Sequence, residues 1–266
     1  MGPRVLALAN QKGGVGKTTT AINLATALAA VGERVLIVDL DPQGNASTGL
    51  GLMRQDRAVS TYDVLIGQST IDDGIVMTGV PNVAIIPSTL DLLGVELTIS
   101  NEADRAFRLR DAFRRLAAFT IEGGPITYVL IDCPPSLNLL TINALAAADA
   151  VLVPLQCEFF ALEGLSQLLQ TIEQIRTTLN PRLYIQGVVM TMYDKRNNLS
   201  EQVLGDVRSE MGDLVYDTVI PRNVRLSEAP SYGKPALLYD LKCAGSQAYL
   251  RLATEVIRRE RRLNAA

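Results

Sequence analysis

The feature that most constrains this chain of 266 residues is a stretch near its start, where an apolar run breaks into glycines and ends in lysine and threonine. Residues 5–9 are all apolar, which is typical of a strand buried on both faces of a parallel sheet. Gly13, Gly14 and Gly16 then let the backbone amides turn inward and cradle phosphate oxygens. Apolar positions recur with helical spacing over residues 21–28, so a strand, a phosphate-binding loop and a helix are predicted in succession.

The loop carries the groups that nucleotide phosphates require. Lys17 is expected to reach the β- and γ-phosphates as a point charge, and the Thr18 hydroxyl to ligate Mg²⁺. Gln11 stands where the usual pattern has glycine, and a second lysine, Lys12, precedes the glycines, so the loop is a deviant one. A glycine turn with two solvated lysines is the alternative, which the flanking strand and helix disfavour. The predicted phosphate-binding residues are Gly13, Gly14, Val15, Gly16, Lys17, Thr18 and Thr19.

Composition limits both the chemistry and the partners. A chain that is 48% hydrophobic and 20% charged can bury a large core, and we expect residues 1–266 to form one α/β domain with a mostly parallel sheet between helices. The formal net charge of −3 supplies no global positive field, so any nucleic-acid binding must use a local basic patch. Because histidine is absent, acid–base chemistry must come from carboxylates, lysines, backbone amides or a metal ion, which suits phosphoryl transfer.

Cysteine spacing and the N-terminal sequence indicate a cytoplasmic protein with reduced thiols. Cys133, Cys157 and Cys243 lie far apart without a C-x-x-C pair, so neither a disulfide framework nor a zinc site is predicted. The first apolar run is too short for a secretory signal. The most apolar stretch, residues 144–155, is short and contains Asp149, so no membrane-spanning segment is expected.

Two carboxylates follow the second predicted strand, residues 35–38. A helix joins this strand to the first one, which predicts that the two are parallel and that Asp39 and Asp41 lie at the ligand-binding edge of the sheet. Asp41 is expected to orient a water against a γ-phosphate or to hold Mg²⁺ through a water. The alternative is an Asp-Pro turn that caps the next segment, and the phosphate-binding loop in the same βαβ unit favours the functional interpretation.

A third apolar run, residues 128–131, ends in Asp132 and two prolines. This has the form of a Walker B segment, in which a strand delivers an aspartate to the sheet edge beside the phosphate-binding loop. Asp132 is expected to hold the water shell of Mg²⁺ and to bond Thr18. An apolar run ending in aspartate is a weak signal alone, and the preceding loop strengthens it.

Weaker patterns fill in the rest of the chain. Two polar loops carry basic residues around Arg196 and Arg225, and each loop taken singly is more often solvated than bound to nucleic acid. The last predicted helix has an apolar stripe and an arginine-rich end, so packing on the sheet is favoured over a membrane-surface helix. Strands are predicted at residues 83–87, 151–155 and 184–191, and helices at residues 61–66, 105–119, 162–172 and 244–262.

With these residues in hand, the chain resembles the ParA/Soj family of chromosome- and plasmid-partitioning ATPases. The resemblance runs nearly end to end, through residues 10–19, 39–45, 132–136, 160–164 and 220–231. The short form, without an N-terminal DNA-binding extension, resembles the chromosomal members.

The resemblance implies roles for several residues in binding and hydrolysing ATP. It implies an ATP-driven sandwich homodimer, in which Lys12 of one subunit reaches the phosphates held by the other. By the same likeness Asp41 positions the hydrolytic water, Thr18 ligates Mg²⁺, and the segment with Pro221 and Asn223 lies beside the adenine.

The resemblance also implies macromolecular partners. Members of the family bind double-stranded DNA without sequence preference, through arginines that match Arg196 and Arg225. A ParB-type protein bound at centromere-like sites stimulates their slow hydrolysis, which places the protein on the nucleoid in the cytoplasm.

Two other classes share the deviant loop. A Min-type ATPase that works at membranes is the first alternative, and its mark is a detachable amphipathic C-terminal helix. An iron protein with a cluster shared between subunits is the second, and it needs two cysteines per chain that face the dimer axis. Cys133 alone is placed to serve in that way, since Cys157 is expected to be buried and Cys243 lies far along the chain.

Overall fold

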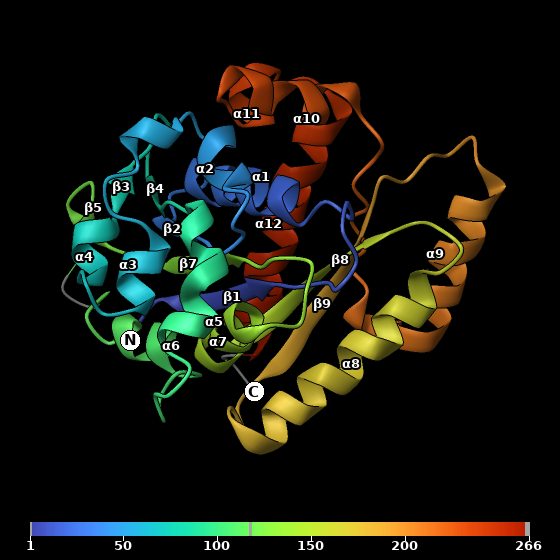
Figure 1. Ribbon diagram of the computed structural model, residues 1–266. Helices are drawn as coiled ribbons and strands as arrows, with labels where there is room; N and C mark the ends of the chain where they lie inside the picture. The colour runs from blue at the N-terminus through green and yellow to red at the C-terminus, as the bar shows by residue number, and fades with distance from the viewer. Residues whose placement is uncertain (1, 117–118, 264–266) are drawn as a thin grey trace.

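The computed structural model describes residues 2–116 and 119–263, which form a central sheet between two layers of helices (Figure 1). The strand order is β3-β4-β2-β7-β1-β8-β9, and every neighbouring pair is parallel except β3 with β4. The predicted α/β fold with a mostly parallel sheet is therefore confirmed. The strands of this sheet are β1 (Arg4–Leu8), β2 (Val35–Asp39), β3 (Val76–Met77), β4 (Val83–Ile86), β7 (Tyr128–Asp132), β8 (Ala150–Gln156) and β9 (Tyr184–Thr191).

Helices cover both faces of the sheet because successive strand residues point to opposite sides. In β1, Leu6 and Leu8 pack toward α1 and α12, whereas Val5 and Ala7 pack toward α6, α7 and α8. A separate small hairpin pairs β5 (Thr120–Ile121) with β6 (Gly124–Pro125). The α-helices are α1 (Lys17–Ala30), α2 (Asn45–Gly49), α3 (Thr61–Leu65), α4 (Ile71–Gly74), α5 (Val95–Thr98), α6 (Arg108–Phe113), α7 (Leu139–Ala147), α8 (Ala161–Thr178), α9 (Asn198–Met211), α10 (Val224–Glu228), α11 (Ala236–Tyr239) and α12 (Ala244–Leu263).

The predicted helix over residues 105–119 is wrong in its extent. The structure has only α6 there, and residues 117–118 lie outside the described residues. The cause is tertiary, because the side chain of Asn143 donates to the carbonyl of Arg105 at 2.8 Å and accepts from the amide of Leu109 at 3.2 Å. A side chain of α7 thus holds the turn before α6 and sets where that helix begins.

Helix α9 was not predicted, although its sequence carries the signals of a helix. Asn197 caps its N-terminus by accepting from the amide of Leu199 at 3.0 Å, and Val203, Leu204 and Val207 are buried. Figure 1 shows helix α9 on the side of the molecule where β9 forms the edge of the sheet.

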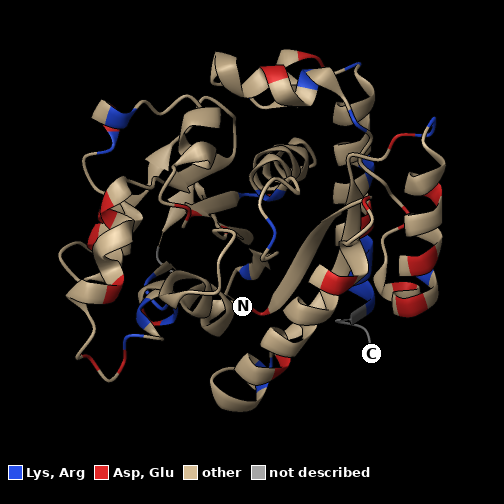
Figure 2. Ribbon diagram, turned by 45° about the vertical axis from the view of Figure 1, so that its right-hand side comes forward, with Lys and Arg blue, Asp and Glu red and all other residues tan. Residues whose placement is uncertain are grey.

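The C-terminal helix α12 packs against the sheet beside α1, and packing on the sheet was predicted. Tyr249, Leu252, Ala253 and Val256 are buried, and the Tyr249 hydroxyl lies 3.1 Å from the Thr20 hydroxyl of α1. Lysine and arginine positions gather toward the C-terminal end of this helix (Figure 2). Among residues 2–116 and 119–263, no helix combines the length and the apolar character that crossing a bilayer requires.

One glycine of β9 tests how tightly this edge is packed. A Cβ added at Gly187 would lie 2.5 Å from Cε2 of Tyr216 and 2.9 Å from the carbonyl oxygen of Leu214, so Gly187→Ala is expected to lower the free energy of unfolding by about 1–3 kcal/mol. Gly205 in α9 meets no atom within 4 Å, so Gly205→Ala is expected to raise it by up to about 1 kcal/mol. Urea unfolding measures both variants, and a Gly187→Ala protein as stable as the parent would contradict the packing.

Candidate nucleotide-binding site

The order of the strands brings the predicted site together at one edge of the sheet. Strand β7 lies between β1 and β2, with Asp132 opposite both Leu8 and Asp39. The loop that follows β1 and the carboxylates that end β2 and β7 therefore emerge side by side (Figure 1). The first two predicted strands are parallel, as expected, although β7 separates them.

Backbone geometry and two side chains shape the loop between β1 and α1. Gly14 and Gly16 have φ values of 76° and 87°, a conformation that costs glycine little, and α1 begins directly after Gly16. The Asn10 side chain donates to the carbonyl of Pro154 at 2.8 Å and accepts from the amide of Lys12 at 3.0 Å. The Thr191 hydroxyl donates to the carbonyl of Val15 at 2.8 Å, so the ends of β8 and β9 hold the loop.

Lys17 lies inside this loop and not on its surface. Its side chain is buried, and its ammonium donates to the carbonyl of Lys12 at 2.9 Å, which spans the loop from end to start. Burial lowers the pKa of Lys17, and the nearby Asp132 charge opposes that change. A buried ammonium held among backbone groups is a site for an anion.

Asp132 is a buried carboxylate that lacks a good partner. Among the described residues, neither of its oxygens accepts a hydrogen bond of normal geometry. Burial raises the pKa of Asp132 well above its usual range, the Asp39 charge raises it further, and the nearby Thr18 and Lys17 oppose the change. An unpaired buried carboxylate is unfavourable, and oxygen ligands of this kind suit Mg²⁺, so these residues fit a magnesium ion.

The two aspartates after β2 differ in their surroundings. Asp39 is fully buried and accepts from the amide and the hydroxyl of Ser47 at 2.9 and 2.7 Å, and burial raises its pKa to about 6. Asp41 is half-buried, and its carboxylate accepts from the amide of Gln43 at 3.0 Å. The carbonyl of Asp41 also accepts from the amide of Gly44 at 2.9 Å, so the Asp-Pro turn, which was the alternative interpretation, forms here beside a half-buried carboxylate.

A cavity of about 570 Å³ opens beside the loop. Gly16, Thr19, Pro221 and Asn223 line it, which brings the segment around residue 221 next to the phosphate-binding loop. The side chain of Asn223 is already engaged, because it caps α10 by accepting from the amide of Arg225 at 3.0 Å. The sequence interpretation missed other residues of its wall, which sit at or just beyond the ends of β8 and β9, among them Gln156, Cys157, Met192 and Asp194.

Lys12 does not join the other residues of the loop. Its side chain is exposed on the outer side and forms an ion pair with Glu158, just before α8. Cys133 is buried next to Asp132, and burial raises the pKa of its thiol. The structure thus brings together Lys17, Thr18, Asp41 and Asp132, and leaves Lys12 at the surface.

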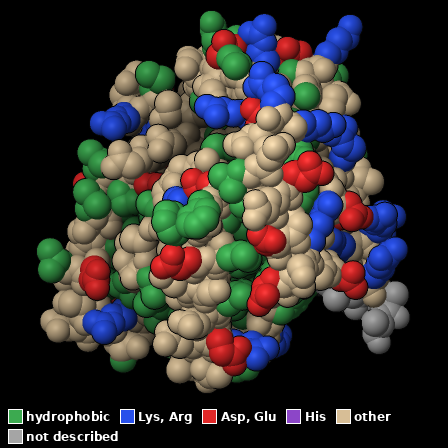
Figure 3. Space-filling view, turned by 90° about the vertical axis from the view of Figure 1, so that its right-hand side faces the viewer, with side chains coloured by type: hydrophobic (Ala, Val, Ile, Leu, Met, Phe, Trp, Pro, Cys, Tyr) green, Lys and Arg blue, Asp and Glu red, His purple; other side chains and the backbone are tan. Residues whose placement is uncertain are grey.

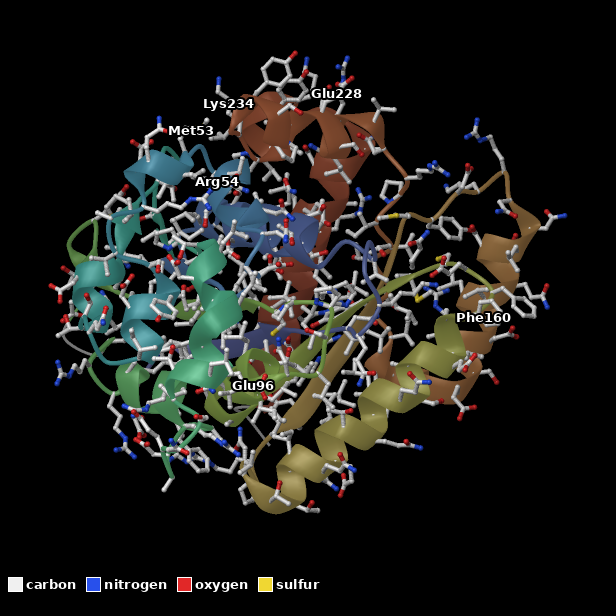
Figure 4. All side chains as sticks on the ribbon, viewed as in Figure 1. Met53, Arg54, Glu96, Phe160, Glu228 and Lys234 are labelled. Atoms are coloured by element: carbon white, nitrogen blue, oxygen red, sulfur yellow. The ribbon has the colours of Figure 1, made fainter. Side chains whose placement is uncertain are left out.

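Arg196 and Arg225 are both exposed and both paired with acids of their own chain. Arg196 donates from Nε and Nη2 to Asp194 at 3.0 and 2.9 Å. Arg225 donates to Glu228 at 2.7 Å, and Figure 4 shows Glu228 at the outer edge of the molecule. Figure 3 shows basic side chains interspersed with acidic ones on the α8 and α9 side of the molecule.

Comparison with known proteins adds relatives over the whole length. The family model of the AAA domain matches residues 3–185. The chromosome partitioning protein ParA of Caulobacter vibrioides (strain NA1000 / CB15N) is 68% identical, with 97% of this chain and 95% of that protein covered. The sporulation initiation inhibitor protein Soj of Bacillus subtilis (strain 168) is 50% identical, with 95% of this chain and 98% of that protein covered.

Solved structures share the fold. Cobyrinic acid a,c-diamide synthase from Mycobacterium smegmatis, crystallised with ADP and magnesium, matches with a TM-score of 0.83 at 38% identity, covering 97% of this chain and 96% of that one. The cell division ATPase MinD of Pyrococcus furiosus matches with a TM-score of 0.78 at 28% identity, covering 97% and 99%. The identity to ParA and Soj, over nearly the full length, is higher than the identity to either of these solved structures. Together with the geometry of the loop and its carboxylates, this identity shows that the chain belongs to the ParA/Soj family of chromosome-partitioning proteins.

Proposed function

We propose that this protein is a slow, Mg²⁺-dependent ATPase whose ATP-bound dimer holds DNA during chromosome partitioning. The observation that carries the proposal is the buried Lys17 ammonium beside the unpartnered Asp132 carboxylate, at the edge where the glycine loop opens. An anion next to the first group and a cation next to the second would satisfy both buried charges. Relatives named ParA and Soj, and a structural neighbour holding ADP and magnesium, support ATP as the substrate.

The residues of the site divide the chemistry between them. The amides from Gly13 to Thr19 and the Lys17 ammonium bind and orient the phosphates, and the cavity with Pro221 and Asn223 takes the adenine. Asp41 orients the attacking water. When bound, Mg²⁺ would neutralise phosphate charge, held by Thr18 directly and by Asp41 and Asp132 through water.

Formation of the proposed ATP-bound dimer depends on Lys12. Its side chain is exposed, and an ion pair with the carboxylate of Glu158 holds it at the surface. In the proposed sandwich dimer, Lys12 leaves Glu158 for the more concentrated negative charge of the triphosphate in the other subunit. Hydrolysis then ends the dimer, and a ParB-type protein accelerates this step.

A membrane-associated Min-type ATPase is the competing function. The similarity of the fold to MinD supports this alternative. Against it, the apolar face of α12 is buried against α1, so α12 is not a free amphipathic helix. The names of the family relatives favour partitioning, and we propose that the protein works on the nucleoid.

We expect Arg196 and Arg225 to contact the phosphates of DNA. Each loop alone carries too few charges, and two copies of both loops on one face of a dimer contact several phosphates at once. Released counterions then make log K fall with log[salt] at a slope of roughly −0.9 per phosphate contacted. Replacing both arginines with alanine should weaken binding to all sequences alike and flatten this slope.

The matched control for this experiment is Arg176→Ala. Arg176 is paired with Glu173 at 2.7 Å, as Arg225 is with Glu228, but it lies in the last turn of α8. Binding of random-sequence duplexes with ATP is measured at several salt concentrations for each variant. If the Arg196→Ala/Arg225→Ala protein keeps the parental affinity and slope, these arginines do not bind DNA.

A further inference from the structure

A buried guanidinium in the segment between β2 and β4 has no part in the site described so far. Arg57 follows the short 3-10 helix η1 (Arg54–Asp56) and is only 7% exposed. Its two terminal nitrogens donate to the carbonyls of Ser88 and Leu52 and to the hydroxyl of Thr48, each at 2.8 Å, and to the carbonyl of Gly44 at 3.3 Å. One side chain therefore ties the segment after β2 to the residue that follows β4 by two positions.

Burying this charge is unfavourable unless the contacts that it makes repay the cost. Among the described residues its Nε has no hydrogen-bond partner and its acceptors are all neutral, so it forms no close ion pair. Burial lowers the pKa of Arg57, and the charge of the buried Asp39 opposes that change. A cation kept in such a position is unusual in a simple surface turn.

The contacts of Arg57 lead directly to Asp41. The Ser88 hydroxyl donates to the carbonyl of Asp41 at 2.5 Å, and the Ser88 carbonyl is the one that Arg57 holds. The Ser88 amide donates to the hydroxyl of Ser47 at 3.1 Å, which in turn donates to Asp39 at 2.7 Å. Ser88 thus bonds the Asp41 backbone at one end of the turn that presents the Asp41 carboxylate and the Ser47 side chain beyond the other end.

Gly44 completes the arrangement at the other end of that turn. Its φ is 64°, and a Cβ added there would collide with Nη1 of Arg57. The guanidinium therefore lies directly against the backbone at Gly44, and its carbonyl acceptors belong to residues before and after Arg57 in the chain, Gly44, Leu52 and Ser88. All four acceptors of Arg57 lie outside the phosphate-binding loop, residues 10–19.

We propose that Arg57 is a positioning residue for ATP hydrolysis, which acts through Ser88 and Gly44 to hold the Asp41 carboxylate in line with the attacking water. The inference rests on the proposed function, in which Asp41 orients that water. Catalytic geometry tolerates little error, since a displacement of about 1 Å costs roughly 100-fold in rate. Because none of the hydrogen-bond acceptors of Arg57 belongs to the phosphate-binding loop, its loss should slow hydrolysis and leave ATP affinity unchanged.

The test compares four single variants for ATP affinity, from a fluorescent ATP analogue, and for single-turnover hydrolysis. Arg57→Ala is expected to slow hydrolysis roughly 10- to 100-fold, with an ATP Kd within about twofold of the parent. Arg57→Lys recovers part of the rate, because one ammonium cannot bridge both segments. Ser88→Ala removes the bond of the hydroxyl to the Asp41 carbonyl, together with a long one to the Thr89 carbonyl at 3.5 Å, and reproduces a smaller part of the loss. Arg54→Ala is the control, an exposed arginine three residues earlier that Figure 4 labels on the outer turn, and it should match the parent.

A purely structural role is separated by repeating Arg57→Ala in an Asp41→Ala background. A positioning residue has nothing left to position there, so the second change should add no further loss of rate. The inference is overturned if folded Arg57→Ala hydrolyses at the parental rate, if its ATP affinity falls in step with its rate, or if the two changes multiply. Where Arg57→Ala does not fold, parental turnover in Ser88→Ala overturns it. If Asp41→Ala itself hydrolyses normally, the role assigned to Asp41 in the proposed function fails first, whatever Arg57 does.

Discussion

Lys17→Ala is expected to abolish measurable ATP binding and with it ATP hydrolysis. The ammonium of Lys17 is buried at the centre of the loop, where few water molecules weaken its attraction for phosphate. Removing one pre-organised electrostatic contact of this kind costs roughly 10²–10³ in turnover, and here the same group also binds the ground state. Equilibrium titration with a fluorescent ATP analogue and a phosphate-release assay measure the two effects.

Two controls show that the loss belongs to the site and not to the fold. Thermal unfolding without nucleotide should change little, because the alanine removes a buried charge along with its bond to the Lys12 carbonyl. Saturating ATP should raise the unfolding temperature of the parent and not that of the variant, since only a bound ligand stabilises the folded state by mass action. Unchanged turnover in Lys17→Ala would sink the assignment of the loop.

Asp41→Ala is expected to bind ATP normally and to hydrolyse it at least about 100-fold more slowly. The change removes the half-buried carboxylate and keeps the loop, the Asp132 carboxylate and the cavity beside the loop intact. The protein should then accumulate as an ATP-bound dimer, because the step that ends the dimer is blocked. Lys12→Ala should behave in the opposite way, staying monomeric with ATP because it lacks the contact across the interface.

Light scattering after size exclusion distinguishes these outcomes. Asp72→Ala serves as the control, because Asp72 is an exposed aspartate in α4, away from the end of β2. An Asp41→Ala protein that stays monomeric in saturating ATP would count against the role of Asp41 in hydrolysis. A Lys12→Ala protein that forms a dimer with ATP would count against the contact of Lys12 with the other subunit.

Local sequence patterns were enough to predict the parts of the site that lie on regular elements. The apolar strands that end in Asp39 and Asp132, the glycines of the loop and the helix after them form where their patterns place them. The insertion of β7 between β1 and β2 did not follow from any local pattern, because strand order is decided by packing between distant segments. The same holds for α6, whose start is set by Asn143 of another helix.

Side-chain pairing was the least predictable part. Nothing near Arg57 in the sequence marks it as buried, since its acceptors are three backbone carbonyls and the Thr48 hydroxyl, and one of them, the Ser88 carbonyl, lies 31 positions away. The ion pairs of Lys12, Arg196 and Arg225 were likewise invisible in the charge pattern, which counts charges and does not show which acids they meet. These pairs matter for function, because each proposed contact with phosphate must replace one of them.

We propose that ATP switches this protein into a DNA-binding form. The affinity for DNA in each nucleotide state tests this switch. Binding of a random-sequence DNA duplex is compared with ATP, with ADP and without nucleotide, using Asp41→Ala to keep ATP from being consumed. We predict tight binding with ATP and weak binding in the other two states, with no preference among duplex sequences. Equal affinity in all three states, or no binding by a protein that light scattering shows to be an ATP-bound dimer, would contradict the account.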